Sequence, residues 1–81
     1  MKTSVDISYY PLNEEFVPHI KDFIARMNTY KNLVVRTNTL SPQIFGEYRE
    51  IMDALTNEIE KSFSLPHSVF IIKMINADRE K

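Results

Sequence analysis

Two segments of the chain carry apolar residues at the spacing of an amphipathic helix, and this pattern constrains the fold more than any other feature. Apolar positions recur every three or four residues, first in residues 16–27 and again in residues 48–63. Such a helix is stable only when its apolar stripe is covered by another element. The first stripe is Phe16, Ile20, Phe23, Ile24 and Met27, and the second is Tyr48, Ile51, Met52, Leu55, Ile59 and Phe63.

The limits of the two helices follow from proline and from polar residues at their ends. Pro18 is tolerated only in the first turn of a helix, so we expect a loose turn over residues 13–16 and a regular helix from about Val17. Asn13 is a candidate N-cap for this helix. The second helix is expected over about residues 47–62.

Three segments around these helices are typical of strands. Residues 4–10 alternate between apolar and polar side chains, which indicates a half-buried strand that Pro11 ends. Residues 33–39 contain adjacent β-branched residues that favour a second strand. Residues 68–75 form the last strand of the chain, and a charged tail over residues 76–81 is expected to be frayed.

A short strand is also expected between the second strand and the second helix. Ser41-Pro42 is predicted to be a turn, because serine and proline are common there. Residues 43–45 then form the strand, which Gly46 ends. Gly46 is the only glycine, so its backbone is expected to need either a positive φ or the close approach of a neighbour.

The resulting order of elements is β-α-β-β-α-β in a chain of 81 residues. This order predicts a single α+β domain over residues 1–81 with a ferredoxin-like sandwich, in which two helices cover one face of a four-stranded antiparallel sheet.

The last strand is apolar on both of its faces, although two helices cover only one face of such a sheet. Val69 and Ile71 lie on one face, and Phe70, Ile72 and Met74 lie on the other. Exposed apolar rows on small domains often mark an interface, so the uncovered face is a candidate for self-association. The alternative is a twisted edge strand that the tail partly covers.

Composition excludes several classes of function. Ten basic and eleven acidic residues give a net charge of −1, which argues against a nucleic-acid partner. The absence of cysteine excludes disulfides and cysteine-type metal sites, and a single glycine excludes the common glycine-rich nucleotide loops. The longest apolar run, over residues 69–72, is far shorter than the ~20 residues of a membrane-spanning helix. The start of the chain also lacks the apolar stretch of a signal peptide, so we expect a soluble cytoplasmic protein with no membrane partner.

Little in the chain points to catalysis. The two histidines, His19 and His67, are far apart in the sequence, and neither has a nucleophile or metal-ligand partner near it. We therefore expect neither catalytic residues nor a metal site, and no enzyme activity.

The most unusual stretch of the chain is residues 36–43, where five neutral hydrogen-bonding side chains occur among eight residues. Such a set suits a small polar heterocycle, because hydroxyl and amide groups both donate and accept hydrogen bonds. The alternative is an ordinary polar hairpin, where the same residue types are common. Glu47 follows Gly46 at the start of a helix, where its carboxylate would either cap the helix or bind a ligand amine.

Three segments together resemble the YkoF-like thiamine-binding protein family, formerly a domain of unknown function. They are Ile7-Ser8-Tyr9-Tyr10-Pro11-Leu12, Val35-Arg36-Thr37-Asn38-Thr39-Leu40-Ser41 and Ile44-Phe45-Gly46-Glu47-Tyr48. The resemblance extends over residues 4–79.

This resemblance implies a ferredoxin-like fold that assembles as a homodimer or homotetramer. It also implies binding of thiamine or its hydroxymethylpyrimidine portion, without catalysis and without a further cofactor. Many members carry an acid where this chain has Phe45, so recognition of the pyrimidine amine would fall to Glu47. A homo-oligomeric interaction module without ligand binding is the alternative. The implied hydrogen-bonding residues are Ser8, Thr37, Asn38 and Glu47, and the implied stacking residues are Phe45 and Tyr10.

Overall fold

The computed structural model describes residues 1–38 and 41–80 of the chain. Thr39, at the predicted end of the second strand, and Lys81, at the end of the predicted tail, lie outside the described residues. The elements follow the predicted order: β1 (Lys2–Pro11), α1 (Phe16–Met27), β2 (Val34–Asn38), β3 (Ser41–Glu47), α2 (Tyr48–Ser62) and β4 (Ser68–Ile75).

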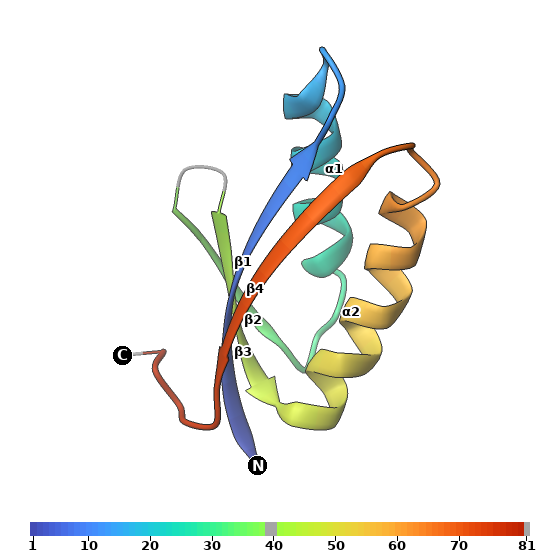
Figure 1. Ribbon diagram of the computed structural model, residues 1–81. Coiled ribbons are helices and arrows are strands. Elements are labelled where there is room, and N and C mark those ends of the chain that lie inside the picture. The colour runs from blue at the N-terminus through green and yellow to red at the C-terminus, as the bar shows by residue number, and fades with distance from the viewer. Residues whose placement is uncertain (39–40, 81) are drawn as a thin grey trace.

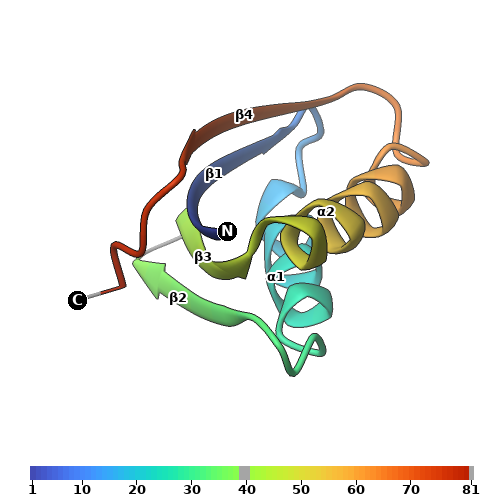
Figure 2. The ribbon, with the colours of Figure 1, turned by 90° about the horizontal axis from the view of Figure 1, so that it is seen from below.

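The four strands form one sheet in the order β2-β3-β1-β4, with every neighbouring pair antiparallel. Both helices pack on the same face of this sheet (Figures 1 and 2). This arrangement is the ferredoxin-like α+β fold, which confirms the prediction. We call the face that points away from the helices the open face.

The core lies between the helices and the sheet. Alternate residues of β1 point toward the helices, as the period of two predicted, and its central position on this face, Ile7, is fully buried. Phe70 stacks on Tyr9 with ring centroids 4.3 Å apart, and Phe23 of α1 lies 5.2 Å from Phe70. These rings attach β4 to the core. The buried cluster consists of Val5, Ile7, Tyr9, Ile20, Phe23, Met27, Leu33, Ile44, Ile51, Ala54 and Leu55.

The prediction of a turn at Ser41-Pro42 is wrong. Both residues lie in β3, where Thr37 of β2 pairs with Pro42. The pairing of β3 with β1 begins only at Gln43, so Pro42 lies where β3 has a paired strand on one side alone. A proline without an N–H is tolerated at such an edge position.

The sequence predicted that Gly46 ends the strand, but Gly46 lies inside β3, which continues to Glu47. Its φ is outside the left-handed region, so of the two predicted requirements the close approach is the one that applies. A Cβ at this position would lie 2.6 Å from Cδ2 of Leu33, which is much closer than van der Waals contact allows. Glycine is therefore needed here for space.

The helices begin close to their predicted positions, but their caps differ from the prediction. Helix α1 begins at Phe16, with Pro18 in the first turn as proline requires. Its N-cap residue is Glu15 and not Asn13, whose Oδ1 accepts a hydrogen bond from the N–H of Glu15 at 2.9 Å. Glu47 is the N-cap residue of α2, without a side-chain capping bond.

A charged cluster joins the two helices, and we call Arg26, Tyr30, Glu58 and Ser62 the interhelical cluster. Glu58 of α2 is 4% exposed, and it accepts hydrogen bonds from Arg26 Nη1 at 2.8 Å and from the Tyr30 hydroxyl at 2.5 Å. Arg26 Nη2 donates to Ser62 Oγ at 2.7 Å. Burial alone raises the pKa of Glu58, but these hydrogen bonds and the charges of Lys61 and Arg26 outweigh it, so the pKa is lowered.

The segment after β4 folds back over the open face instead of fraying, so that prediction is wrong for the described residues. Ser4 Oγ donates to the carbonyl of Ala77 at 2.6 Å and accepts from the N–H of Arg79 at 2.9 Å. Glu80 forms an ion pair with Arg36 of β2 at 3.0 Å. The C-terminal segment therefore crosses the sheet from β4 to β2, on the side opposite the helices (Figure 2).

Candidate functional site

A row of polar side chains crosses the open face at the middle of the sheet. The strand register places Lys73 of β4 opposite Asp6 of β1, Asp6 opposite Gln43 of β3, and Gln43 opposite Arg36 of β2. Directly opposite side chains on one face of a sheet are near neighbours, with Cβ atoms about 5 Å apart. Charged and amide groups from four strands thus meet in one line across the sheet.

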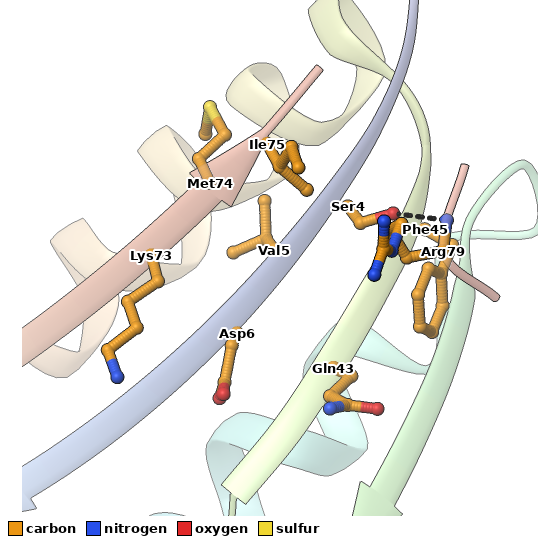
Figure 3. Close-up of a pocket in the computed structure, with 9 residues that line it drawn as sticks. All are labelled: Ser4, Val5, Asp6, Gln43, Phe45, Lys73, Met74, Ile75 and Arg79. Atoms are coloured by element: carbon orange, nitrogen blue, oxygen red, sulfur yellow. Dashed lines mark hydrogen bonds between the residues drawn. The ribbon is translucent and has the colours of Figure 1, made fainter. Parts of the chain in front are cut away.

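A cavity of about 240 Å³ lies between this row and the C-terminal segment. Figure 3 shows the side chain of Arg79 reaching back from that segment toward the sheet, close to Ser4 and Phe45. The polar lining of the cavity consists of Ser4 and four further residues, which we call the cavity cluster: Asp6, Gln43, Lys73 and Arg79. The remaining lining residues are Val5, Phe45, Met74 and Ile75.

The side chains of the cavity cluster have no partners among residues 1–38 and 41–80. In the part of the chain that the structure describes, none of them forms a hydrogen bond or an ion pair with another residue. Arg36 belongs to the same cross-strand row but is already paired with Glu80. The cavity cluster is therefore available to a ligand, whereas Arg36 is engaged in fixing the C-terminal segment.

The residue types around the cavity define the chemistry that it offers. A carboxylate accepts hydrogen bonds from an amine or a protonated ring nitrogen, and an amide both donates and accepts them. Phe45, a residue that is 7% exposed, lines the cavity with an aromatic ring, the kind of surface on which a flat heterocycle packs. Two cationic side chains, Lys73 and Arg79, are suited to an anionic group.

Residues 1–38 and 41–80 do not meet the requirements of a metal cluster or of a membrane-spanning helix. Within those ranges, no three histidine, aspartate or glutamate side chains lie where they would hold a metal ion together. No helix there is both long enough and apolar enough to span a bilayer.

The structure does not bring the six predicted site residues together. Phe45 lines the cavity described above, whereas Ser8 and Tyr10 line a second cavity of about 390 Å³ near the start of α1. Glu47 pairs with Lys2 in the register of the sheet, six residues before Ser8 on β1. That separation is about 20 Å along a strand, so one small ligand would not contact Ser8 and Glu47 of the same chain.

Thr37 and Asn38 lie at the end of β2, where both are exposed. Asn38 pairs with Ser41, and Ser41 lines the second cavity together with Ser8. The predicted residues therefore fall into two groups at opposite ends of the sheet. Only Phe45 belongs to the cavity that contains the unpaired charges.

Glu47 is engaged by the start of the chain. Its Oε2 accepts a hydrogen bond from the Met1 amino group at 2.7 Å. That hydrogen bond and the charge of the ammonium group lower the pKa of Glu47. The Glu47 carboxylate is therefore engaged in an ion pair with the Met1 amino group, and Glu47 lines neither of the two cavities.

Sequence reasoning missed Asp6, Lys73 and Arg79 as site residues, and it noted Gln43 only as one of the five polar side chains in residues 36–43. The alternation of residues 4–10 already placed Asp6 on the face away from the core, and that signal would have identified it. Identifying Lys73 requires the register between β1 and β4, which places it opposite Asp6 and which the sequence does not reveal. Arg79 comes from a segment that was expected to be frayed.

The comparisons with known proteins agree on the fold. No protein-family model matches the chain, and no curated protein matches it. A hypothetical protein from Methanocaldococcus jannascii has a TM-score of 0.81 and 20% identity, over 99% of this chain and 84% of that chain. A Thermotoga maritima protein, assigned provisionally by its name to thiamine biosynthesis or salvage, has a TM-score of 0.76 and 16% identity, over 95% of this chain and 85% of that chain.

A domain of unknown function, DUF77, from Bacillus cereus is also similar. It has a TM-score of 0.73 and 11% identity, over 98% of this chain and 79% of that chain. At such identities the likeness shows the ferredoxin-like fold alone. Membership of the thiamine-binding family stays a prediction.

Proposed function

We propose that this protein binds a small aminopyrimidine, thiamine or its hydroxymethylpyrimidine portion, without catalysing a reaction. The observation that carries the proposal is the cavity on the open face, where an aromatic ring lies beside polar side chains that have no partner among the residues the structure describes. The similarity of fold to a protein named for thiamine biosynthesis or salvage is consistent with it.

The chemistry of an aminopyrimidine matches the lining of this cavity. The Asp6 carboxylate accepts a hydrogen bond from the exocyclic amine, and the Gln43 amide donates to or accepts from a ring nitrogen. The Phe45 ring packs against the heterocycle, a contact of about 1 kcal/mol. In this assignment Asp6, and not Glu47, recognises the amine, because Glu47 is already paired with the Met1 amino group.

The size of the cavity favours the pyrimidine over the whole of thiamine. Pockets for drug-sized ligands have volumes of roughly 300–1,000 Å³. This cavity, at about 240 Å³, is smaller and suits a ligand with one ring. Hydroxymethylpyrimidine is therefore the first ligand to test.

Isothermal titration calorimetry of the full chain with hydroxymethylpyrimidine, and separately with thiamine, tests the proposal. We expect saturable binding at one ligand per chain or per dimer, with hydroxymethylpyrimidine the tighter of the two. Asp6→Asn should weaken binding at least tenfold, because a hydrogen bond to a charged group contributes about 1.5–3 kcal/mol. Asp53→Asn, on the exposed surface of α2, is the matched control. An absence of heat up to millimolar ligand at two temperatures would overturn the proposal.

A second candidate function is a homo-oligomeric interaction module, which the exposure of β4 favours. On the open face Ile71 is 51% exposed and Ile75 is 45% exposed, and on the other face Ile72 is 40% exposed. An edge strand with apolar residues on both faces is prone to pair with another chain. Light scattering coupled to size-exclusion chromatography tests this: we expect a dimer or tetramer that Ile71→Lys disrupts. A monomer at micromolar concentration would overturn it.

A further inference from the structure

We propose that the cavity prefers an aminopyrimidine that carries a phosphate ester, and that Lys73 and Arg79 bind this phosphate. The inference rests on the proposed function, because it concerns the same cavity and the same ligand ring. It assigns to the two cations a role that neither the fold nor the amine-binding chemistry requires.

The charge balance of the cavity is the first argument. Its lining contains two cationic side chains and one carboxylate, Asp6. If Asp6 binds the amine of the ligand, neither Lys73 nor Arg79 has an anionic partner within the described residues. A ligand with a cationic thiazolium ring would add to this positive charge, whereas a phosphate would neutralise it.

The placement of the two cations is the second argument. Lys73 lies on β4 directly opposite Asp6, and Arg79 reaches the cavity from the segment that crosses the open face (Figure 3). The cations therefore approach from the sheet and from the segment over it. A phosphate has several oxygens, so it can accept hydrogen bonds from both sides at once. The planar guanidinium of arginine matches that geometry with two donors, and the lysine ammonium adds a point charge.

Ser4 is the positioning residue for Arg79, and this is the third argument. Ser4 is only 7% exposed. Its hydroxyl donates a hydrogen bond to the Ala77 carbonyl and accepts one from the Arg79 N–H. The second bond fixes the backbone of Arg79 over the cavity. The ion pair of Glu80 with Arg36 holds the next residue in the segment. An arginine held in this way loses little further freedom when it binds an anion.

The test compares hydroxymethylpyrimidine with its phosphate ester by calorimetry, in a buffer that contains no phosphate. For the wild-type chain we expect the ester to bind about tenfold more tightly or better, since hydrogen bonds between charged groups are stronger than those between neutral ones. This preference should decline as salt is added. Lys73→Gln and Arg79→Gln should each reduce the preference, because each should weaken binding of the ester more than binding of the unphosphorylated pyrimidine. Ser4→Ala should reduce the preference partly.

Exposed residues of the same types provide matched controls. Lys21→Gln on α1 and Arg49→Gln on α2 remove the same charges from surfaces outside the cavity, and both should keep the wild-type preference. Urea unfolding of each variant shows whether it is folded. Because Lys73 and Arg79 are exposed and their side chains have no partner in the described part of the chain, both variants should remain as stable as the wild type.

The possible outcomes separate this inference from the proposed function. Binding of both pyrimidines with equal affinity would overturn the inference and leave the proposed function standing. A preference for the ester that survives both Lys73→Gln and Arg79→Gln would overturn the assignment of the phosphate site. If neither pyrimidine binds, the proposed function fails and the inference fails with it.

Discussion

The interhelical cluster and the cavity cluster use the same kinds of residue in opposite ways. In the interhelical cluster every charged group is paired, and the Glu58 carboxylate accepts hydrogen bonds from two side chains of the first helix and its loop. In the cavity cluster the carboxylate, the amide and both cations have no partner among the described residues. One cluster is complete within the chain, and the other is not.

The difference follows from burial. A charge withdrawn from water, as in Glu58, destabilises the folded chain by several kcal/mol unless it is paired and hydrogen-bonded. An exposed charge such as Asp6 keeps its water, so the fold does not require it to have a partner. Unpaired charges are common on any surface. What distinguishes the cavity cluster is that four unpaired groups converge on one cavity beside an aromatic ring.

The largest effect is expected from breaking the interhelical cluster. Glu58→Ala removes the buried carboxylate that binds Arg26 and Tyr30, and it leaves Arg26 paired only with the exposed Asp22 of its own helix. We expect the free energy of unfolding to fall by about 3 kcal/mol. Urea denaturation followed by circular dichroism measures this change. Glu60→Ala is the control, because Glu60 lies on the same helix and is exposed. It should change the free energy of unfolding by less than about 0.5 kcal/mol. A loss below about 1 kcal/mol for Glu58→Ala would show that the cluster does not hold the helices together.

The pH dependence of stability should also come from the interhelical cluster. The pKa of Glu58 in the folded chain lies below its ordinary value of 4.5, so its contribution is complete above pH 4.5 and is lost as the pH falls through the folded-state pKa. The hydrogen bond to Glu58 raises the pKa of Tyr30 above 10.0, so a second loss begins as the pH rises past 10. Urea unfolding at a series of pH values measures this dependence. In acid, the free energy of unfolding should fall less steeply with decreasing pH, giving a shallower acid limb, for Glu58→Gln than for the wild type. A limb as steep as that of the wild type would contradict this attribution.

The sequence predicted the covered half of the molecule better than the open half. Periodicity reports which side of an element is buried, so the stripes of both helices and the alternation of β1 were sufficient for the fold. Gly46 was recognised as special, but only the structure shows that Leu33 is the residue that fills the space beside it. Ser41-Pro42 was misassigned because local turn preference does not reveal which neighbouring strand is present.

The cavity was beyond the reach of the sequence for a different reason. It joins Asp6 near the start of the chain to Lys73 and Arg79 near the end, and no local pattern connects residues so far apart. Arg79 reaches the cavity only because Ser4 binds the C-terminal segment. Two of the three motifs of the family resemblance directed attention to the opposite end of the open face, where Ser8 and Asn38 lie, and the third contains Phe45, which lines the cavity.

A smaller effect on stability is expected from the cavity cluster. Asp6→Asn should change the free energy of unfolding by less than about 0.5 kcal/mol, because it removes no interaction within the described chain. The same variant should lose affinity for hydroxymethylpyrimidine. Paired urea and calorimetric titrations separate the two properties. A large loss of stability in Asp6→Asn would mean that the carboxylate has a structural role, and the comparison between the clusters would fail.

The smallest effect is expected from Asn38→Ala, which decides between the two ends of the open face. If the ligand occupies the cavity beside Phe45, this substitution should leave the affinity for hydroxymethylpyrimidine unchanged, because Asn38 does not line that cavity. If the ligand instead contacts the residues that the family resemblance indicated, the lost hydrogen bond should weaken binding by about 0.5–1.5 kcal/mol. Calorimetry with Asn38→Ala and Asp6→Asn in parallel gives the answer. A variant pair in which only Asn38→Ala loses affinity would move the site to the end of β2, and the unpaired charges beside Phe45 would then need another explanation.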